Sequence, residues 1–349
     1  MDRQADDTTP PPKQRQLGWG TLKSSGGTKH LGRATRPTRP SDECILRFVK
    51  VTELDDFIAV LRAPEVQNLA KFFARNLARA DDLRYMYLHL IFPNVMAERE
   101  MKVMTQVIKE RAVERVMGSD DRFTPEFLKE VYRRVMEDGE EAIDSYLARG
   151  ARERVENLTA RDPQFGRWLN ALQQNAATAL WSAFEALASD LWIQAVNSRP
   201  DLFAKRVMQQ FSESLQRHGL SSRSIPLGVA AKYSFDLRHH IGDIIADVID
   251  FTSLDVVRKA YKSAFGIDEE GQRLLEADRL RKLVLIRNLV VHRGGVVDVA
   301  FKERTGCPDK VGDELTIDED SASQFVDAVK AAGLYILKLV DSCLATASA

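Results

Sequence analysis

The stretch that decides the fold reads ALWSAFEALASDLWIQAV and spans residues 179–196. Its large apolar side chains recur every three or four positions, which is the spacing of one face of an α-helix. The positions between them are small or polar, so the stripe predicts core packing rather than a platform on which nucleic-acid bases stack. We expect this helix to begin near Trp168 and to end before Pro200. The stripe consists of Leu180, Trp181, Phe184, Leu187, Leu191 and Trp192.

Helical periodicity continues on the C-terminal side of this stretch. It predicts helices over residues 202–217, over 228–264 in one or two pieces, over 269–293 and over 322–345. Only GVVDVAFKERTGCPDKVGDELTI, residues 295–317, has strand-like character, with room for one hairpin at most. Because strands and helices do not alternate and no repeat occurs, the sequence predicts an all-α fold.

On the N-terminal side the chain divides into two further segments. Residues 43–165 show helical periodicity, including a helix start at Thr124-Pro125-Glu126, and predict a helical domain of unknown role. The boundary with a C-terminal helical domain over 166–349 is placed near Pro163. Residues 1–42 hold five of the twelve prolines and eight basic against four acidic residues, which predicts a disordered basic leader. An electrostatic arm for RNA or a protein partner is the alternative interpretation.

The chain as a whole is almost neutral, with 50 Lys and Arg against 51 Asp and Glu. This balance excludes a uniformly basic nucleic-acid coat, although a local basic site remains compatible with it. Cys44, Cys307 and Cys343 are odd in number and far apart, which argues against a disulfide framework or a zinc site and for a reducing cytoplasm. Neither a membrane-spanning run nor a secretory signal is found, so a cytoplasmic protein that does not bind membranes is expected.

The segment LVLIRNLVVHRGGVVD, residues 283–298, carries the chemistry. The glycine pair at 294–295 is expected to end a helix by adopting positive φ, which places His292 in the last helical turn. Asn288 precedes His292 by four positions and shares its helix face, so its amide can orient the imidazole. Arg287 lies about 140° around a regular helix from His292. The two side chains would converge only by reaching round the helix or across a dimer.

A histidine and an arginine without a carboxylate cage suit the cleavage of RNA. Imidazole can move a proton to or from a hydroxyl near neutral pH, and guanidinium can stabilise a phosphorane-like transition state. RNA supplies its own nucleophile, the 2′-OH, so the sequence predicts neither a metal nor a cofactor. Residues 273–304 hold eight basic and four acidic side chains, which would attract a phosphate backbone. The candidate phosphate-binding residues are Arg281, Lys282 and Arg293.

The run RNLVVH, followed by RGGVVD and VAFKERTG, resembles the HEPN superfamily (higher eukaryotes and prokaryotes nucleotide-binding), and within it the RiboL-PSP branch. The family signature is an arginine, a polar residue, three variable positions and a histidine, which Arg287, Asn288 and His292 fill here. The helix ALWSAFEALASDLW is similar to the first helix of the family, with Glu185 at its acidic position. The resemblance covers about residues 168–345.

This resemblance implies a HEPN-like helical bundle that forms a homodimer, in which two Arg/His sets face one cleft. Many family members are metal-independent endoribonucleases of toxin or phage-defence systems that leave a 2′,3′-cyclic phosphate. It therefore implies an RNA substrate and an antitoxin or regulatory protein as partners. His292 would be the general acid/base, Arg287 would contact the scissile phosphate and Asn288 would orient His292. Other members bind nucleotides or act as scaffolds, so a non-catalytic interaction module is the alternative.

Two further histidine patterns have other interpretations. His239, Asp243 and Asp247 share a helix face and could ligate a divalent metal, although a solvated polar face is the favoured interpretation. Arg84 and His89 repeat the spacing of Arg287 and His292 without the polar residue or the glycine pair, which predicts a packing or surface role. Walker, G-x-S-x-G, H-E-x-x-H and G-x-G-x-x-G motifs do not occur, so kinase, acyl-transfer and dehydrogenase chemistry have no support.

Overall fold

The computed structural model describes residues 51–116, 143–220 and 224–346. The predicted leader over 1–42 and the predicted helix start at Thr124-Pro125-Glu126 lie outside these residues. Every regular element within them is a helix, which confirms the all-α prediction. Within the same residues, the strand character expected near 295–317 is reduced to one antiparallel bridge between Val296 and Glu314.

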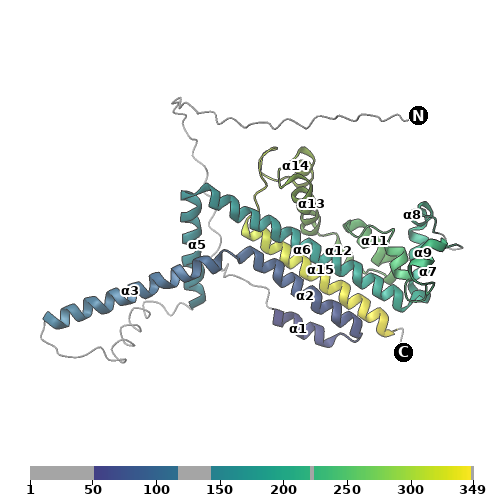
Figure 1. Cartoon of the computed structure of the whole chain (residues 1–349), viewed down its shortest axis with the longest axis horizontal. Helices are drawn as coiled ribbons and strands as arrows, with labels where there is room; N and C mark the ends of the chain where they lie inside the picture. The colour runs from purple at the N-terminus through teal and green to yellow at the C-terminus, as the bar shows by residue number, and fades with distance from the viewer. Residues whose placement is uncertain (1–50, 117–142, 221–223, 347–349) are drawn as a thin grey trace, which may run out of the picture. The chain divides into compact units, whose positions relative to one another are not determined.

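Helix α6, Pro163–Ser198, is the long central element of the structure (Figure 1). The carboxylate of Asp162 accepts a hydrogen bond from the backbone N–H of Gln164 at 2.9 Å, and Pro163 occupies the first helical turn. Proline is favoured there because its fixed φ suits the helix and its missing N–H would have no partner in any case. The helix therefore begins before Trp168, at the proline where the sequence suggested a boundary.

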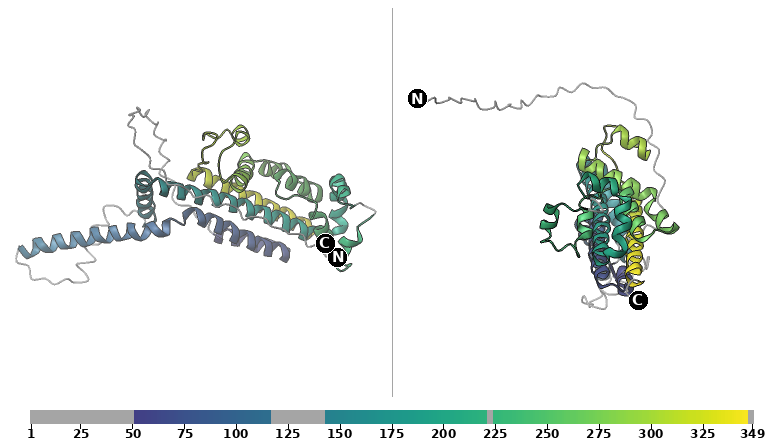
Figure 2. Two further views of the ribbon diagram at one scale, coloured as in Figure 1. Left: turned by 45° about the horizontal axis from the view of Figure 1, so that its top comes forward. Right: turned by 90° about the vertical axis from the view of Figure 1, so that its right-hand side faces the viewer.

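Helix α6 packs against α2 (Pro64–Tyr85), α13 (Asp278–Arg293) and α15 (Glu319–Thr346). Helices α1 and α2 lie along one side of the α6–α15 pair, and α13 lies on the other side, with α14 beyond it (Figures 1 and 2). The other helices are α1 Val51–Val60, α3 Leu88–Val116, α5 Ile143–Arg161, α7 Pro200–Gln210, α8 Ser212–Arg217, α9 Leu227–Lys232, α10 Ile241–Ala246, α11 Leu254–Phe265, α12 Glu269–Leu275 and α14 Val299–Thr305.

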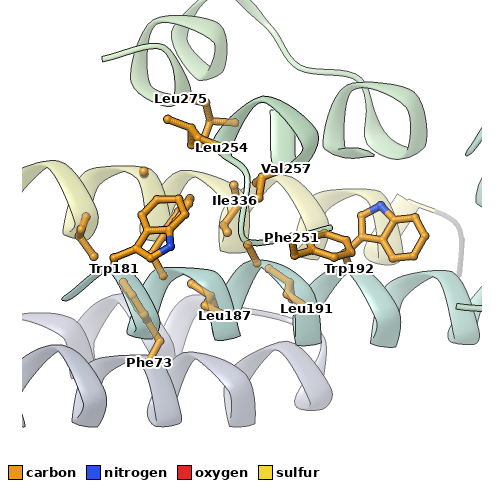
Figure 3. Close-up of a cluster of buried hydrophobic side chains, with 14 of the residues drawn as sticks. Phe73, Trp181, Leu187, Leu191, Trp192, Phe251, Leu254, Val257, Leu275 and Ile336 are labelled. Atoms are coloured by element: carbon orange, nitrogen blue, oxygen red, sulfur yellow. The ribbon is translucent and has the colours of Figure 1, made fainter. Parts of the chain in front are cut away.

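The aromatic stripe of α6 forms the centre of the hydrophobic core. Trp181 and Trp192 are completely buried, which confirms the packing interpretation of the stripe. Figure 3 shows them among Phe73 of α2, Ile336 of α15 and Val257 of α11. These three helices come from distant parts of the sequence, and together they cover the apolar stripe of α6.

Helices on both sides of Pro163 contribute to this core. The Phe73 ring of α2 lies so close to Gly333 of α15 that a Cβ atom at position 333 would overlap it. All of the described residues belong to one compact unit. The sequence boundary near Pro163 thus separates two segments of chain that share one core. A second, smaller core forms where α3 meets α5, around Leu88 and Val95.

Three of the predicted helices are interrupted. The segment predicted over 202–217 forms α7 and α8, which lie on either side of Phe211. The segment over 228–264 forms three helices, α9, α10 and α11, where one or two were expected. Ser234 and Phe235 adopt positive φ after α9, a conformation that apolar periodicity does not reveal and that ends a right-handed helix. The segment over 269–293 is divided into α12 and α13 by a short connection at 276–277.

A buried carboxylate joins the N-terminal end of α2 to α15. Asp341 Oδ1 accepts hydrogen bonds from the backbone N–H groups of Arg62 and Ala63, each at 2.8 Å. Ala63 is the N-cap of α2 and offers no side-chain acceptor of its own. Asp341 therefore satisfies backbone donors at a helix start that the local sequence leaves without a cap.

We expect Asp341→Ala to lower the free energy of unfolding by about 1–3 kcal/mol, because two backbone donors at a buried site lose their acceptor. Urea unfolding followed by circular dichroism measures this change. Asp327→Ala is the matched control, since Asp327 is an exposed carboxylate on the same helix. Equal losses in the two variants would contradict a capping role for Asp341.

Candidate functional site

The predicted catalytic residues lie in the last two turns of α13. One face of this helix is buried in the core, which turns the opposite face outward. Arg281, Asn288 and His292 are all exposed, and their separations of seven and four residues place them within about 40° on a regular helix. They form one exposed row along α13, with Arg281 about 16 Å from His292 along the axis. The buried face consists of Leu280, Leu283, Ile286 and Leu289.

Asn288 binds Arg287 in this structure. Nη1 of the half-buried Arg287 donates a hydrogen bond to Asn288 Oδ1 at 3.0 Å. Among the described residues, no hydrogen bond joins His292 to Asn288 or to Arg287. The chain thus holds Arg287 against Asn288 and leaves the His292 imidazole exposed near the helix end.

The glycine pair ends α13 as the sequence predicted. Gly294 adopts the left-handed conformation with φ 61°, and its N–H donates to the carbonyl of Val290 at 3.0 Å. Gly295 follows with φ 79° and donates to Leu289 at 3.3 Å. This left-handed C-cap satisfies carbonyl groups at the helix end and places His292 in the last turn.

Two amides of α6 anchor the chain after this turn. Gln174 is only 5% exposed, and its Nε2 donates to the carbonyl of Leu315 at 2.8 Å. Asn170, one turn earlier, donates to the same carbonyl at 2.9 Å. Leu315 in turn donates its N–H to the carbonyl of Gly295 at 2.8 Å. The sequence analysis did not predict a role for either amide. The one pattern that could have indicated it is the spacing of Asn170 and Gln174, which lie four residues apart and so share a face of a largely apolar helix.

The segment VAFKERTG forms helix α14 instead of a strand. Asp298 caps it by accepting a hydrogen bond from the N–H of Phe301 at 2.7 Å, and Gly306 ends it with φ 62°. The cap and the terminal glycine outweigh the β-branched residues that suggested a hairpin. Helix α14 therefore follows directly after the turn that carries His292.

The other candidate residues are spread around α13. Arg293 is exposed, and its Nε lies 3.9 Å from Asp298 Oδ2, so the Asp298 carboxylate balances part of its charge through a loose ion pair. Lys282 is half-buried on a different face from Arg281. Glu185 is half-buried on α6, and none of the described contacts links it to His292. Arg281 and Arg293 are therefore the cations with open access to a ligand that lies along the exposed row.

Exposed apolar side chains surround the end of α13. Val291 is 52% exposed and Val299 is 57% exposed, and Val296 lies between them in sequence. Single exposed valines are ordinary, but three of them beside an exposed imidazole make an apolar rim next to a basic row. Such a rim suits contact with another macromolecule.

The two aspartates of the alternative metal pattern bind other partners. Asp243 Oδ2 accepts a hydrogen bond from Asn197 at 2.8 Å and lies 3.2 Å from His240 Nδ1. Asp247 pairs with Lys232 at 2.7 Å. Within the ranges that the structure describes, no group of three His, Cys, Asp or Glu side chains is arranged to hold a metal. In those ranges there is also no helix with the length and hydropathy of a membrane span.

We expect Gly295→Ala to lower the free energy of unfolding by about 2–4 kcal/mol, because it combines positive-φ strain with overlap against the Gln174 amide. Gly294→Ala in the same turn has free space for a Cβ atom and should cost only the strain, about 1–2 kcal/mol. Thermal or urea unfolding of both variants tests this difference. If Gly294→Ala were as damaging as Gly295→Ala, the Gln174 contact would have no part in the turn.

Comparisons with protein-family models, with curated proteins and with solved structures found no match to this chain.

Proposed function

We propose that the chain is a metal-independent endoribonuclease of HEPN type that acts as a cytoplasmic homodimer. The observation that carries this proposal is the exposed row on α13, in which a solvent-accessible imidazole lies at the end of a helix that also bears the exposed cations Arg281 and Arg293. An exposed histidine and a nearby guanidinium are the groups that cleavage through the RNA 2′-OH requires. A toxin or phage-defence effector, restrained by an antitoxin or regulatory protein, is the proposed setting.

In the proposed reaction His292 acts as general acid/base and Arg287 stabilises the scissile phosphate. The imidazole takes the proton of the 2′-OH, the 2′ oxygen attacks the adjacent phosphorus, and the bond from phosphorus to the 5′ oxygen breaks. The products are a 2′,3′-cyclic phosphate and a 5′-hydroxyl, and the proton returns to the leaving oxygen. The exposed cations Arg281 and Arg293 would position the RNA backbone along α13.

A second copy of the chain is part of this proposal. Arg287 lies about 140° around the helix from His292, so one protomer does not direct both side chains at the same phosphate. Two copies that meet across the apolar rim of Val291, Val296 and Val299 would bring Arg287 of one protomer toward His292 of the other. In this arrangement Asn288 orients Arg287 through its amide oxygen.

The test is incubation of the purified protein with RNA in EDTA. We expect internal cleavage that continues when divalent ions are chelated, with product ends that carry a 2′,3′-cyclic phosphate. Mass spectrometry of the short products identifies these ends. Cleavage that stops in EDTA and returns with Mg²⁺ would contradict the metal-independent mechanism.

The alternative is a non-catalytic HEPN-like module that binds a nucleotide or a protein. Two observations favour it: Arg287 is held by Asn288 within its own protomer, and the apolar rim beside His292 suits a protein surface. Absence of cleavage for single-stranded, structured and transfer RNA, together with retained RNA or nucleotide binding, would support this function.

A further inference from the structure

A cavity of about 420 Å³ opens between α7, α11 and α12, away from the row on α13. Helix α11 supplies all of the cations that line it, Arg258, Lys259 and Lys262, and no acidic residue lines it. Gln210, the last residue of α7, and Ile267, which follows α11, also line the cavity. The lining thus combines positive charge, an amide and a small apolar surface.

The charges in this cavity are not equally available. Arg258 already pairs with Glu276 and, at 3.4 Å, with Asp255, so its guanidinium is largely balanced. Lys259 and Lys262 are exposed, and among the described residues neither has a hydrogen-bond or ion-pair partner. They are three residues apart on one helix face, where like charges repel each other. The preceding turn of α11 offers no acidic side chain to balance the charge of Lys262, because the residues three and four positions before it are Lys259 and Arg258.

We propose that this cavity binds a small phosphorylated molecule. Two free ammonium groups on one wall suit a phosphate or diphosphate group, because ammonium is a strong point-charge donor to phosphate oxygens. The amide of Gln210 adds a neutral donor, and Ile267 contacts the uncharged part of the ligand. A volume of this size falls within the range of small-molecule sites in proteins. The bound anion removes the repulsion between Lys259 and Lys262.

Isothermal titration of the full-length protein with pyrophosphate at low ionic strength tests the proposal. We expect one saturable site per chain, with affinity that falls as salt is added, because the site is open to solvent. Lys259→Gln combined with Lys262→Gln should weaken binding about tenfold or more, since each removes a charge-assisted contact. Glutamine retains helix propensity, so α11 is expected to remain folded, which circular dichroism checks.

The matched control is Lys71→Gln combined with Lys102→Gln, which removes the same charge from exposed positions on α2 and α3. This control and His292→Ala should both bind pyrophosphate like the unmodified protein, which separates the cavity from the proposed nuclease site. Absence of pyrophosphate binding, or equal weakening in the two double variants, would overturn the proposal. So would lysine-dependent binding of an RNA oligonucleotide without any binding of pyrophosphate.

Discussion

His292→Ala and Arg287→Ala are each expected to lower the rate of RNA cleavage in EDTA by about a thousandfold. The first variant removes the proton-transfer group, and the second removes the positive charge that stabilises the phosphorane-like transition state. His292 is exposed and Arg287 is half-buried, and neither belongs to the fully buried residues of α13. The loss should therefore occur without a change in circular dichroism or in unfolding temperature.

His89→Ala is the control for this experiment, because His89 is an exposed histidine that also follows an arginine by five residues. It should cleave RNA at the unmodified rate. Arg281→Ala, which removes a proposed backbone contact, should reduce affinity for RNA and its salt dependence while leaving the maximal rate nearly unchanged. Full activity in His292→Ala would exclude catalysis by this histidine.

Mixing the two inactive proteins tests whether the site is shared between protomers. If Arg287 of one copy serves His292 of the other, a mixed dimer contains one intact set and one doubly defective set. Co-expression of Arg287→Ala with His292→Ala chains should then restore a measurable fraction of the activity. Failure of a purified mixed dimer to regain activity would mean that both residues act from one protomer or only as a complete pair.

Arg84→Ala is expected to lower the free energy of unfolding by about 3–5 kcal/mol, the largest stability effect among these predictions. Arg84 is 1% exposed at the end of α2, and its Nη1 donates to the equally buried Asp81 at 2.7 Å. Its Nη2 donates to Ser323 Oγ of α15 at 2.7 Å and to the hydroxyl of Tyr85 at 3.1 Å. Burial raises the pKa of Tyr85 far above its ordinary value, so this hydroxyl stays neutral and accepts the bond.

The loss arises mainly because truncation leaves the Asp81 carboxylate buried without this cation. Urea unfolding gives the free energies, with Arg75→Ala as the control, since Arg75 is an exposed arginine on the same helix. The double variant Arg84→Met with Asp81→Ala should lose less than the two single changes added together, because no isolated charge remains. Additive losses would show that the two residues are not energetically coupled.

The Arg84–His89 pair shows how little the spacing of an arginine and a histidine says by itself. The same spacing produces a buried ion pair at Arg84 and an exposed row at His292. The flanking residues separate the two cases. A glycine pair after His292 ends the helix and leaves the imidazole near the surface, whereas Arg84 is followed by Tyr85, whose hydroxyl accepts a hydrogen bond from it. The glycine pair is a local signal that the sequence reveals, whereas the burial of Arg84 depends on its packing against α15.

The sequence by itself determined the all-α class, the core stripe of α6 and the turn that ends α13. These features depend on side-chain periodicity and on glycine conformation, which act over a few neighbouring residues. Only the tertiary structure decided that Asp341 caps the start of α2 and that Gln174 supports Gly295. The bonded groups lie far apart in the chain, 278 residues in the case of Asp341 and Ala63. No local pattern marks such pairs, because their geometry exists only after the helices have packed around α6.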